Sequence, residues 1–246
     1  MVDNKSIELL VNENFLYAKV LEYFGVAFYE SRKKTLAEVC LENNIDQTQL
    51  IEVLESTGNK KKGEFLALNN YPARLMIAYL KHSHQHFVKD HLPSILRRIN
   101  AIKGEEDADL IHDLKVILPM FIDDFVHHIY EEEDRLFSYI STLESFVSEK
   151  TSAIQVQAKI NSFSIQEFAL HHSNSDGEMS GIRGITKNYD IDTISDLQLK
   201  VLYQELDAFD QELAHHAYIE NDILFPKAIQ LEKRAKELLD ETSRMN

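Results

Sequence analysis

The sequence predicts an all-α protein, a four-helix bundle preceded by a small helical domain, and two observations lead to this fold class. The chain has 246 residues but only seven glycines and four prolines. An all-β protein of this size needs more turn-forming residues than that. In addition, four long segments with few helix breakers occupy the C-terminal two thirds of the chain, and four such helices in one domain are typical of a bundle.

The N-terminal part is expected to form short helices, because apolar residues recur there at helical spacing, as in Val20, Leu21 and Phe24. Residues 58–71 contain two glycines and three consecutive lysines and end with Asn-Asn-Tyr ahead of Pro72, a composition typical of a linker. We therefore divide the chain into an N-terminal helical domain (1–57), a linker (58–71) and a bundle (72–246).

The four long segments cover about residues 72–101, 105–141, 160–186 and 193–241. Pro93 lies inside the first and is expected to bend it or to mark a new first helical turn, since proline removes a backbone donor. Ser195 is a possible N-cap for the fourth segment, with Asp196 near the positive end of the helix dipole.

Charge and composition narrow the range of partners. The chain carries 41 acidic and 26 basic residues, a net charge of −15, which would repel nucleic acid and an anionic membrane surface. The longest uncharged apolar run, residues 116–122, is far short of the roughly 20 residues that span a bilayer. Cys40 is the single cysteine and the start of the chain does not resemble a signal peptide, so we expect a reducing, cytoplasmic location.

The histidines reveal an internal repeat. Ten of the eleven fall into four short clusters, and the segment HHIYEEEDRLF (127–137) matches HHAYIENDILF (215–225) at seven of eleven positions. The offset is 88 residues, and the same offset relates His84 to His172. The second half of the predicted bundle therefore looks like a diverged copy of the first.

The repeat indicates a metal site. Residues four apart lie on the same face of a helix, so each His-x-x-x-Glu pair can bind one cation. Four imidazoles and two carboxylates converging in a bundle suit two metal ions, with the glutamates as bridges and iron as the preferred metal. The predicted ligands are His84, His128, Glu132, His172, His216 and Glu220.

A competing arrangement uses Asp124 with His127 and Glu212 with His215, which imitate the Glu-x-x-His pairs of ferritin-like proteins. We favour these acids as surface residues or as partners that orient ligand imidazoles. Interpretations without a metal also exist: isolated histidines are often core residues, and an i,i+4 pair is often a solvated ion pair. The repeated tyrosines are expected to be packing residues, and the repeated Leu-Phe pairs core residues: Tyr130, Tyr218, Leu136, Phe137, Leu224 and Phe225.

The order of a small helical domain, His84, His128-x-x-x-Glu132, His172 and His216-x-x-x-Glu220 followed by LFPKAI resembles the hemerythrin-like iron-sulfur cluster repair proteins, called RIC for repair of iron centres. Residues 35–55 are similar to the family's N-terminal domain. The resemblance implies a non-haem centre of two iron ions, bridged by both glutamates, in a cytoplasmic protein that restores iron-sulfur clusters after oxidative or nitrosative stress. Its implied partners are damaged iron-sulfur proteins, dioxygen and nitric oxide. The alternative is a hemerythrin-like module that binds or senses these gases without turnover.

The sequence departs from the family pattern in two ways. The Cys-Cys-Gly-Gly element of the N-terminal domain is replaced by Tyr29, Glu30, Ser31 and Arg32, so a function that needs a dithiol is not expected. The isolated histidines are about one residue out of the usual register, which leaves His86 and His171 as alternatives to His84 and His172. A homodimer is compatible with the sequence, which leaves the oligomeric state open.

Overall fold

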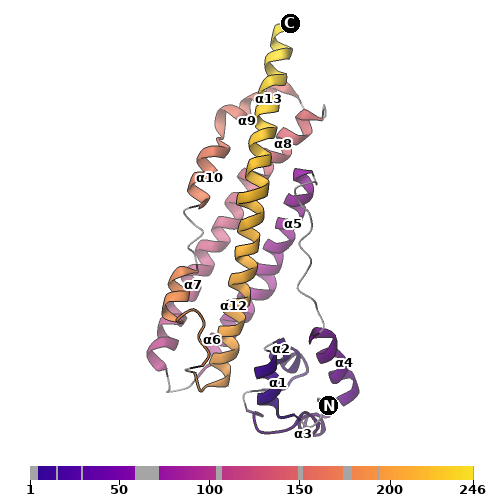
Figure 1. Cartoon of the computed structure of the whole chain (residues 1–246), viewed down its shortest axis with the longest axis vertical. Helices are drawn as coiled ribbons and strands as arrows, with labels where there is room; N and C mark the ends of the chain where they lie inside the picture. The colour runs from indigo at the N-terminus through magenta and orange to yellow at the C-terminus, as the bar shows by residue number, and fades with distance from the viewer. Residues whose placement is uncertain are drawn as a thin grey trace.

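The computed structural model describes residues 5–14, 16–28, 30–58, 72–103, 107–148, 152–173, 179–192 and 194–245. Within these ranges every regular element is a helix, apart from one isolated β-bridge between Ser6 and Thr35, so the predicted all-α class is confirmed. The molecule is elongated, with long helices running along its axis and the N-terminal helices gathered at one end (Figure 1). None of the helices in the described ranges has the length and apolar character that crossing a membrane requires.

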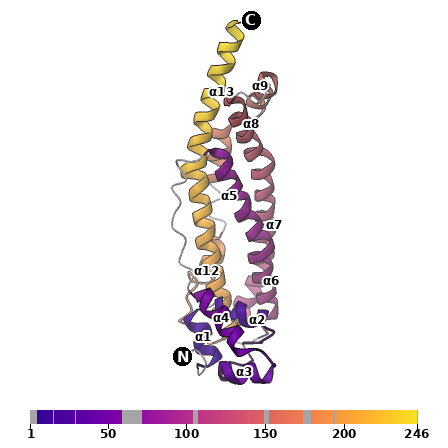
Figure 2. The ribbon, with the colours of Figure 1, turned by 90° about the vertical axis from the view of Figure 1, so that its right-hand side faces the viewer.

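Four short helices form the N-terminal part, as the apolar spacing predicted: α1 (Ile7–Glu13), α2 (Leu16–Tyr23), α3 (Leu36–Glu42) and α4 (Gln47–Gly58). Helix α3 begins with a capping box, in which Thr35 and Glu38 satisfy each other's backbone N–H groups. The predicted linker lies, except for Gly58, in residues 59–71, which are outside the described residues. Figure 2 shows the four helices together below the long ones.

The N-terminal helices pack on the beginning of α12 (Leu197–Tyr218), because their core includes Leu197 and Val201. Arg98 reinforces this contact. Its buried guanidinium donates to Glu205 at 2.7 Å and to Glu22 of α2 at 3.2 Å, and it lies over the ring of Phe28. The N-terminal part is therefore attached to the long helices by an apolar core and by the ion pair between the buried Arg98 and the partly exposed Glu22.

Three of the four expected long segments are continuous helices, and each contains a short π-helical turn. The first comprises α5 (Ala73–His86), η3 (Phe87–His91) and α6 (Leu92–Ala101); the second α7 (Ala108–Glu131), η4 (Glu132–Phe137) and α8 (Ser138–Val147). The last comprises α12, η5 (Ile219–Leu224) and α13 (Phe225–Met245). Pro93 lies in the first turn of α6, where a missing backbone donor is tolerated. Asp196, not Ser195, caps α12, by accepting from the Leu199 N–H at 2.8 Å.

The prediction of one long helix over residues 160–186 is wrong. It contains the end of α9 (Ala153–Ser162), α10 (Ile165–Ser173) and the short α11 (Ser180–Ile185). The first break occurs because Phe163 is extended and packs its ring on Tyr139, while the Ser164 hydroxyl accepts from the Glu167 N–H and begins a new helix. A serine that bonds to the backbone in this way competes with helix continuation.

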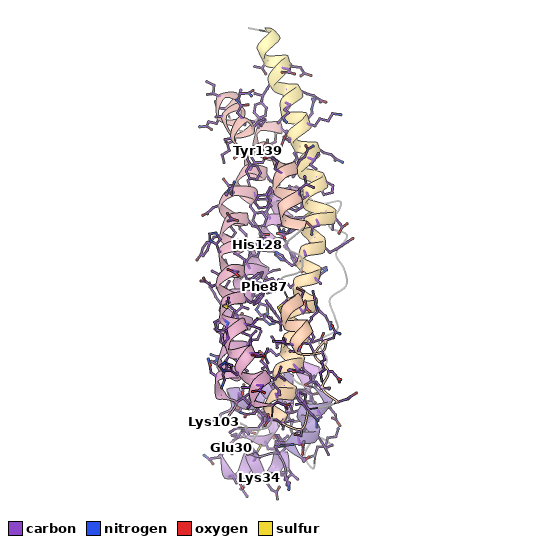
Figure 3. The ribbon with its side chains drawn as sticks, turned by 90° about the vertical axis from the view of Figure 1, so that its left-hand side faces the viewer. Glu30, Lys34, Phe87, Lys103, His128 and Tyr139 are labelled. Atoms are coloured by element: carbon purple, nitrogen blue, oxygen red, sulfur yellow. The ribbon has the colours of Figure 1, made fainter. Side chains whose placement is uncertain are left out.

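Two apolar cores fill the long-helix part of the molecule. One includes Phe87, Ile129 and Phe209, and the other includes Leu80, Leu136 and Ile219. Along these three chain segments, His84, Glu132 and His216 lie between the residues of one core and those of the other, and His128 and Glu220 are next to the core residues Ile129 and Ile219. The polar cluster is thus a layer between two apolar cores. Figure 3 shows His128 at this level, with Phe87 on one side along the axis and Tyr139 on the other.

Candidate metal centre

The six predicted ligands come together in this layer, from α5, α7, η4, α10, α12 and η5. Five are buried to 94% or more, with residue exposures of 2% for His84, 1% for both glutamates, 5% for His172 and 6% for His216. The His128 side chain is 21% exposed. Charged and polar groups are rarely buried unless they are paired or bind a metal, so this cluster requires a functional or structural explanation.

Each His-x-x-x-Glu pair has the geometry that its spacing predicts. His128 Nε2 lies 2.9 Å from Glu132 Oε1, and His216 Nε2 lies 3.4 Å from Glu220 Oε1. Both glutamates lie at the beginning of a π-helical segment, because η4 begins at Glu132 and η5 at the residue before Glu220. Such π-turns are frequent at functional sites, and here they follow the 88-residue repeat.

The ligands form two groups in which the donor atoms lie within 4.8 Å of one another: His84, Glu132, His216 and Glu220; and His128, Glu132 and His172. Glu132 belongs to both groups. Glu220 also reaches the second group, since its Oε2 lies 3.3 Å from His172 Nε2. The cluster could therefore hold two cations that share one carboxylate, with a second carboxylate close to both.

The distances fit this interpretation. Two ligand atoms each about 2.1 Å from a cation and at a right angle to each other are about 3.0 Å apart. His84 Nε2 lies 3.0 Å from His216 Nε2 and 3.2 Å from Glu132 Oε2, and His172 Nε2 lies 2.6 Å from Glu132 Oε1. All four imidazoles thus present Nε2 to the carboxylates, as ligands to a common centre must.

The Nδ1 atoms of the imidazoles, which face away from the carboxylate cluster, differ in their hydrogen bonding. His84 Nδ1 donates to Glu133 Oε1 at 2.9 Å, the type of contact that fixes the orientation of a metal-ligating histidine. Within the described residues, no hydrogen-bond partner is present for His172 Nδ1, His216 Nδ1 or Glu220 Oε1, all of which are buried. An unsatisfied buried carboxylate oxygen is unfavourable, and a cation coordinated by Glu220 would satisfy it. The donor set therefore fits a metal.

Proton equilibria show how strongly the carboxylates act on the imidazoles when no cation is bound. Burial alone would lower the pKa of His172, but Glu132 and Glu220 outweigh it and raise that pKa to about 10. The pKa of His84 is raised for the same reason, with burial opposing Glu132 and Glu133. Burial would raise the pKa of Glu132, yet hydrogen bonds from three imidazoles hold it well below the usual value. The pKa of Glu220 is also lowered, mainly by His216 and His172 against burial and the charge of Glu132.

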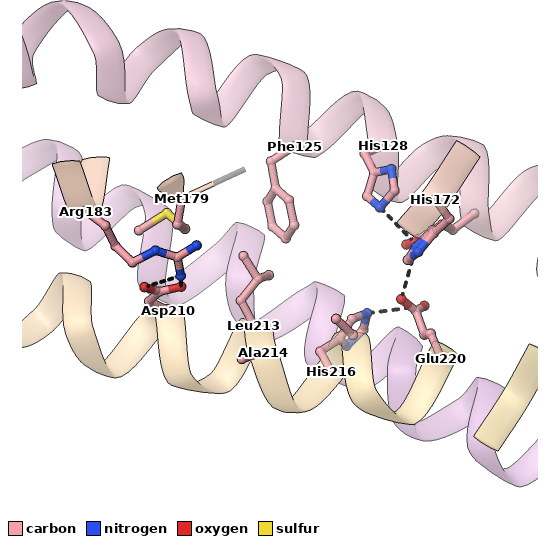
Figure 4. A pocket seen from close by; sticks show the side chains of 12 residues that line it. Phe125, His128, His172, Met179, Arg183, Asp210, Leu213, Ala214, His216 and Glu220 are labelled. Atoms are coloured by element: carbon pink, nitrogen blue, oxygen red, sulfur yellow. Dashed lines mark hydrogen bonds and ion pairs between the residues drawn. The ribbon is translucent and has the colours of Figure 1, made fainter. Parts of the chain in front are cut away.

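A cavity of about 70 Å³ adjoins the cluster. Apolar side chains line one stretch of it, including Phe125, Leu213 and Ala214, and Figure 4 shows these between the imidazoles and an ion pair. That pair joins Arg183 Nη1 to both carboxylate oxygens of Asp210 at 2.9 Å. The volume exceeds what a single water needs, so a small ligand can be accommodated next to the metal ligands.

The alternatives to the predicted ligands are resolved as follows. His86 is exposed and lies 2.6 Å from Asp90, outside both ligand groups, so His84 is the histidine that joins the cluster. The side chain of His171 is outside the described residues. Asp124 and His127 are exposed, and neither they nor Glu212 and His215 belong to the two groups. The ferritin-like pairing is therefore not formed.

The core residues in the repeat are partly as expected. Leu136, Phe137, Leu224 and Phe225 are buried. Tyr130 and Tyr218, expected to be packing residues, are instead 63% and 46% exposed, because they follow the ligand histidines by two positions and so face away from the interior.

Sequence reasoning missed two features. Glu133 is the acceptor for His84, but the repeat gave no signal for it, because Asn221 occupies the equivalent position. The Arg183–Asp210 pair with Tyr189, whose hydroxyl donates to Asp210 at 2.8 Å, is assembled from distant segments without a local motif. Residues 29–32 occupy the position of the family's Cys-Cys-Gly-Gly element, which is missing from this chain. Tyr29 is outside the described residues, and Arg32 donates to Glu8 at 2.6 Å.

A scan against protein-family models and a search of curated proteins found no match to this chain.

Proposed function

We propose that the chain is a non-haem di-metal protein built as a hemerythrin-like four-helix bundle with a small N-terminal helical domain. The observation that carries the proposal is that Glu132 belongs to both ligand groups, since a shared carboxylate is what two neighbouring cations need. The unsatisfied Glu220 oxygen supports it. The histidines and glutamates would bind the cations, and the two apolar cores would exclude bulk water.

Within that class, we propose the function of the iron-centre repair family, in which the chain helps to restore iron-sulfur clusters damaged by oxidative or nitrosative stress. Two iron ions fit the imidazole and carboxylate donors. The support for this function is the resemblance of the ordered ligand motifs. The buried free thiol of Cys40 is compatible with the reducing cytoplasm that this function implies.

Iron bound here would supply reversible redox chemistry and open coordination positions. The residues of the chain have separate parts in it. The two glutamates would balance the charge of the cations, and Glu133 holds the orientation of His84 through its Nδ1. His128 is the most exposed of the four imidazoles and also borders a larger hollow beside Phe163 and Phe168. This side of the centre is therefore the expected route for a cation to enter or leave.

A second candidate function, the binding or sensing of dioxygen or nitric oxide without turnover, is favoured by the cavity. Its apolar stretch at Phe125 and Leu213 suits an uncharged diatomic molecule better than an ion. The Arg183–Asp210 pair lies at the far side of this stretch from the imidazoles (Figure 4).

The test is metal content followed by repair activity. Protein expressed anaerobically with iron should contain about two irons per chain, one for each ligand group, and His128→Ala or Glu220→Ala should lower that number. His82→Ala is the matched control, because His82 is exposed on the same helix as His84 and belongs to neither group. Folded protein that binds no metal at the six residues would refute the proposal.

The two functions are then separated by one assay. An iron-sulfur enzyme inactivated with nitric oxide should regain activity when the loaded protein is added, and the His128→Ala variant should restore less. A reversible spectral change with the gas, without recovery of the damaged enzyme, would favour the binding module instead.

A further inference from the structure

We propose a second, independent cation site on the surface of the long-helix part, formed by His86, His91 and Glu212 and suited to a borderline divalent ion such as Zn²⁺. One donor atom from each residue lies within 4.8 Å of the others. His91 Nε2 is 3.2 Å from Glu212 Oε2, and the rings of the two histidines are 4.5 Å apart. The site joins the end of α5 and η3 to α12.

The π-helical turn explains how the two histidines meet. Residues five apart on a regular α-helix are separated by about 140° around the axis, at roughly 100° per residue. The wider turn of η3 (Phe87–His91) reduces this separation, because its hydrogen bonds connect residues five apart. The sequence HSHQHFVKDH therefore gives two convergent imidazoles only with this π-turn.

His91 carries the proposal furthest. Its side chain is 9% exposed, and neither ring nitrogen has a hydrogen-bond partner within the described residues. A buried imidazole is unfavourable when its Nδ1 has no hydrogen bond and its Nε2 lies 3.2 Å from a carboxylate without forming one. A cation bound at Nε2, between His91 and Glu212, would satisfy one of them.

His86 is oriented as a ligand would be. Its Nδ1 lies 2.6 Å from Asp90 Oδ2, so the carboxylate accepts the Nδ1 proton and Nε2 is the nitrogen left to coordinate. Metal-binding histidines commonly have such a carboxylate behind them. His86 and Glu212 are about half exposed, so solvent can complete the coordination.

The donor set indicates the ion. Two imidazoles and one carboxylate with a water position resemble open zinc sites, whereas Ca²⁺ and Mg²⁺ prefer oxygen ligands. The site is also separate from the six-residue cluster. The Phe87 ring lies between them, with its centroid 6.2 Å from that of His91 and 5.5 Å from that of His216.

The experiment titrates Co²⁺, as a spectroscopic substitute for Zn²⁺, into the protein as isolated with its own metal, whose content is measured before and after. We expect one additional equivalent with visible absorption typical of Co²⁺ bound by nitrogen and oxygen, displaced by Zn²⁺. Glu212→Gln and His86→Ala should weaken this binding at least 10-fold, and Asp90→Asn about 10–100-fold. The exposed His82→Ala variant should bind Co²⁺ as the wild type does.

The outcome does not depend on the di-iron proposal. The same titration in the Glu220→Gln variant, which lacks a ligand of the buried cluster, should still show the additional equivalent and its loss on Glu212→Gln. Glu212 is on the surface, so this substitution is not expected to impair folding. Unchanged Co²⁺ binding in both the Glu212→Gln and His86→Ala variants, or no additional equivalent in the wild type, would overturn the proposal.

Discussion

The two halves of the internal repeat supply matching ligands, yet they hold their carboxylates differently. Glu132 of the first half lies within 3.2 Å of three imidazoles, at 3.2 Å from His84, 2.9 Å from His128 and 2.6 Å from His172. Glu220 of the second half lies farther from its imidazoles, at 3.3 Å from His172 and 3.4 Å from His216. Glu132 is therefore held by close contacts from imidazoles of both halves, whereas the contacts of Glu220 are longer.

The hydrogen bonds of the imidazole Nδ1 atoms also differ between the two halves. In the first half, Glu133 accepts from His84, whereas His172 and His216 of the second half have buried Nδ1 atoms without a hydrogen-bond partner within the described residues. The helix before the second-half repeat is also interrupted at Phe163. The repeat thus preserves the ligand spacing but not the residues that support it.

The largest difference between the two halves is expected in the free energy of unfolding when each glutamate is neutralised. In metal-free protein, Glu132→Gln removes the negative charge that three imidazoles contact and should lower the free energy of unfolding by about 3–5 kcal/mol. Glu220→Gln, with longer contacts, should lower it by about 1–3 kcal/mol. Urea unfolding measures both. Equal losses would mean that the halves are energetically equivalent.

The pH dependence of stability in the metal-free protein sharpens the comparison. The pKa of His172 rises from 6.5 to about 10 on folding, so its contribution is complete below pH 6.5 and is lost as the pH rises toward 10. The pKa of Glu132 falls below 4.5, so its contribution is complete above pH 4.5 and is lost on acidification. Denaturation midpoints should therefore be highest between about pH 4.5 and 6.5.

Two variants test which residue causes each of the two declines in stability, the one at alkaline pH and the one at acidic pH. His172→Gln should flatten the alkaline decline and keep most of the acidic one, because His128 and His84 still lower the pKa of Glu132. Glu132→Gln should flatten the acidic decline and also reduce the alkaline one, because Glu132 is one of the two carboxylates that raise the pKa of His172. A metal-free protein that becomes more stable between pH 7 and 9 would contradict this assignment.

Removing the supporting carboxylate of the first half should have a smaller effect. Glu133→Gln weakens the acceptor behind His84 and should lower metal affinity by about 10–100-fold, as measured by competition with a chelator. Asp134→Asn is the control, because Asp134 is exposed on the next position. If Glu133→Gln leaves the affinity unchanged, the two halves do not differ in this support.

The smallest effect is expected for the repeated tyrosines. Tyr130→Phe and Tyr218→Phe alter exposed side chains and should change the free energy of unfolding by no more than about 0.5 kcal/mol, with the metal content unaltered. A large loss in either variant, seen in thermal unfolding, would restore the packing role that the sequence suggested.

Much of the fold and the candidate site followed from local pattern. The helical spacing at His128 and Glu132, and its copy 88 residues later, placed each pair on one helix face without knowledge of the neighbours. Where local patterns conflicted, prediction failed: residues 160–186 have helical composition, but Ser164 begins a new helix and Phe163 packs on Tyr139. Among the three histidines of HSHQH, the 88-residue offset favoured His84, but the register of the segment left His86 as an alternative.

The sequence alone determined the all-α class and the order and spacing of the six predicted ligands, because helix periodicity is a property of neighbouring residues. Only the tertiary structure decided that His84 joins the buried layer while His86 turns to Asp90, that Glu132 lies in both ligand groups, and that Glu133 supports one imidazole. These outcomes depend on π-turns and on packing between helices distant in sequence, and such contacts leave no periodic signal in the chain.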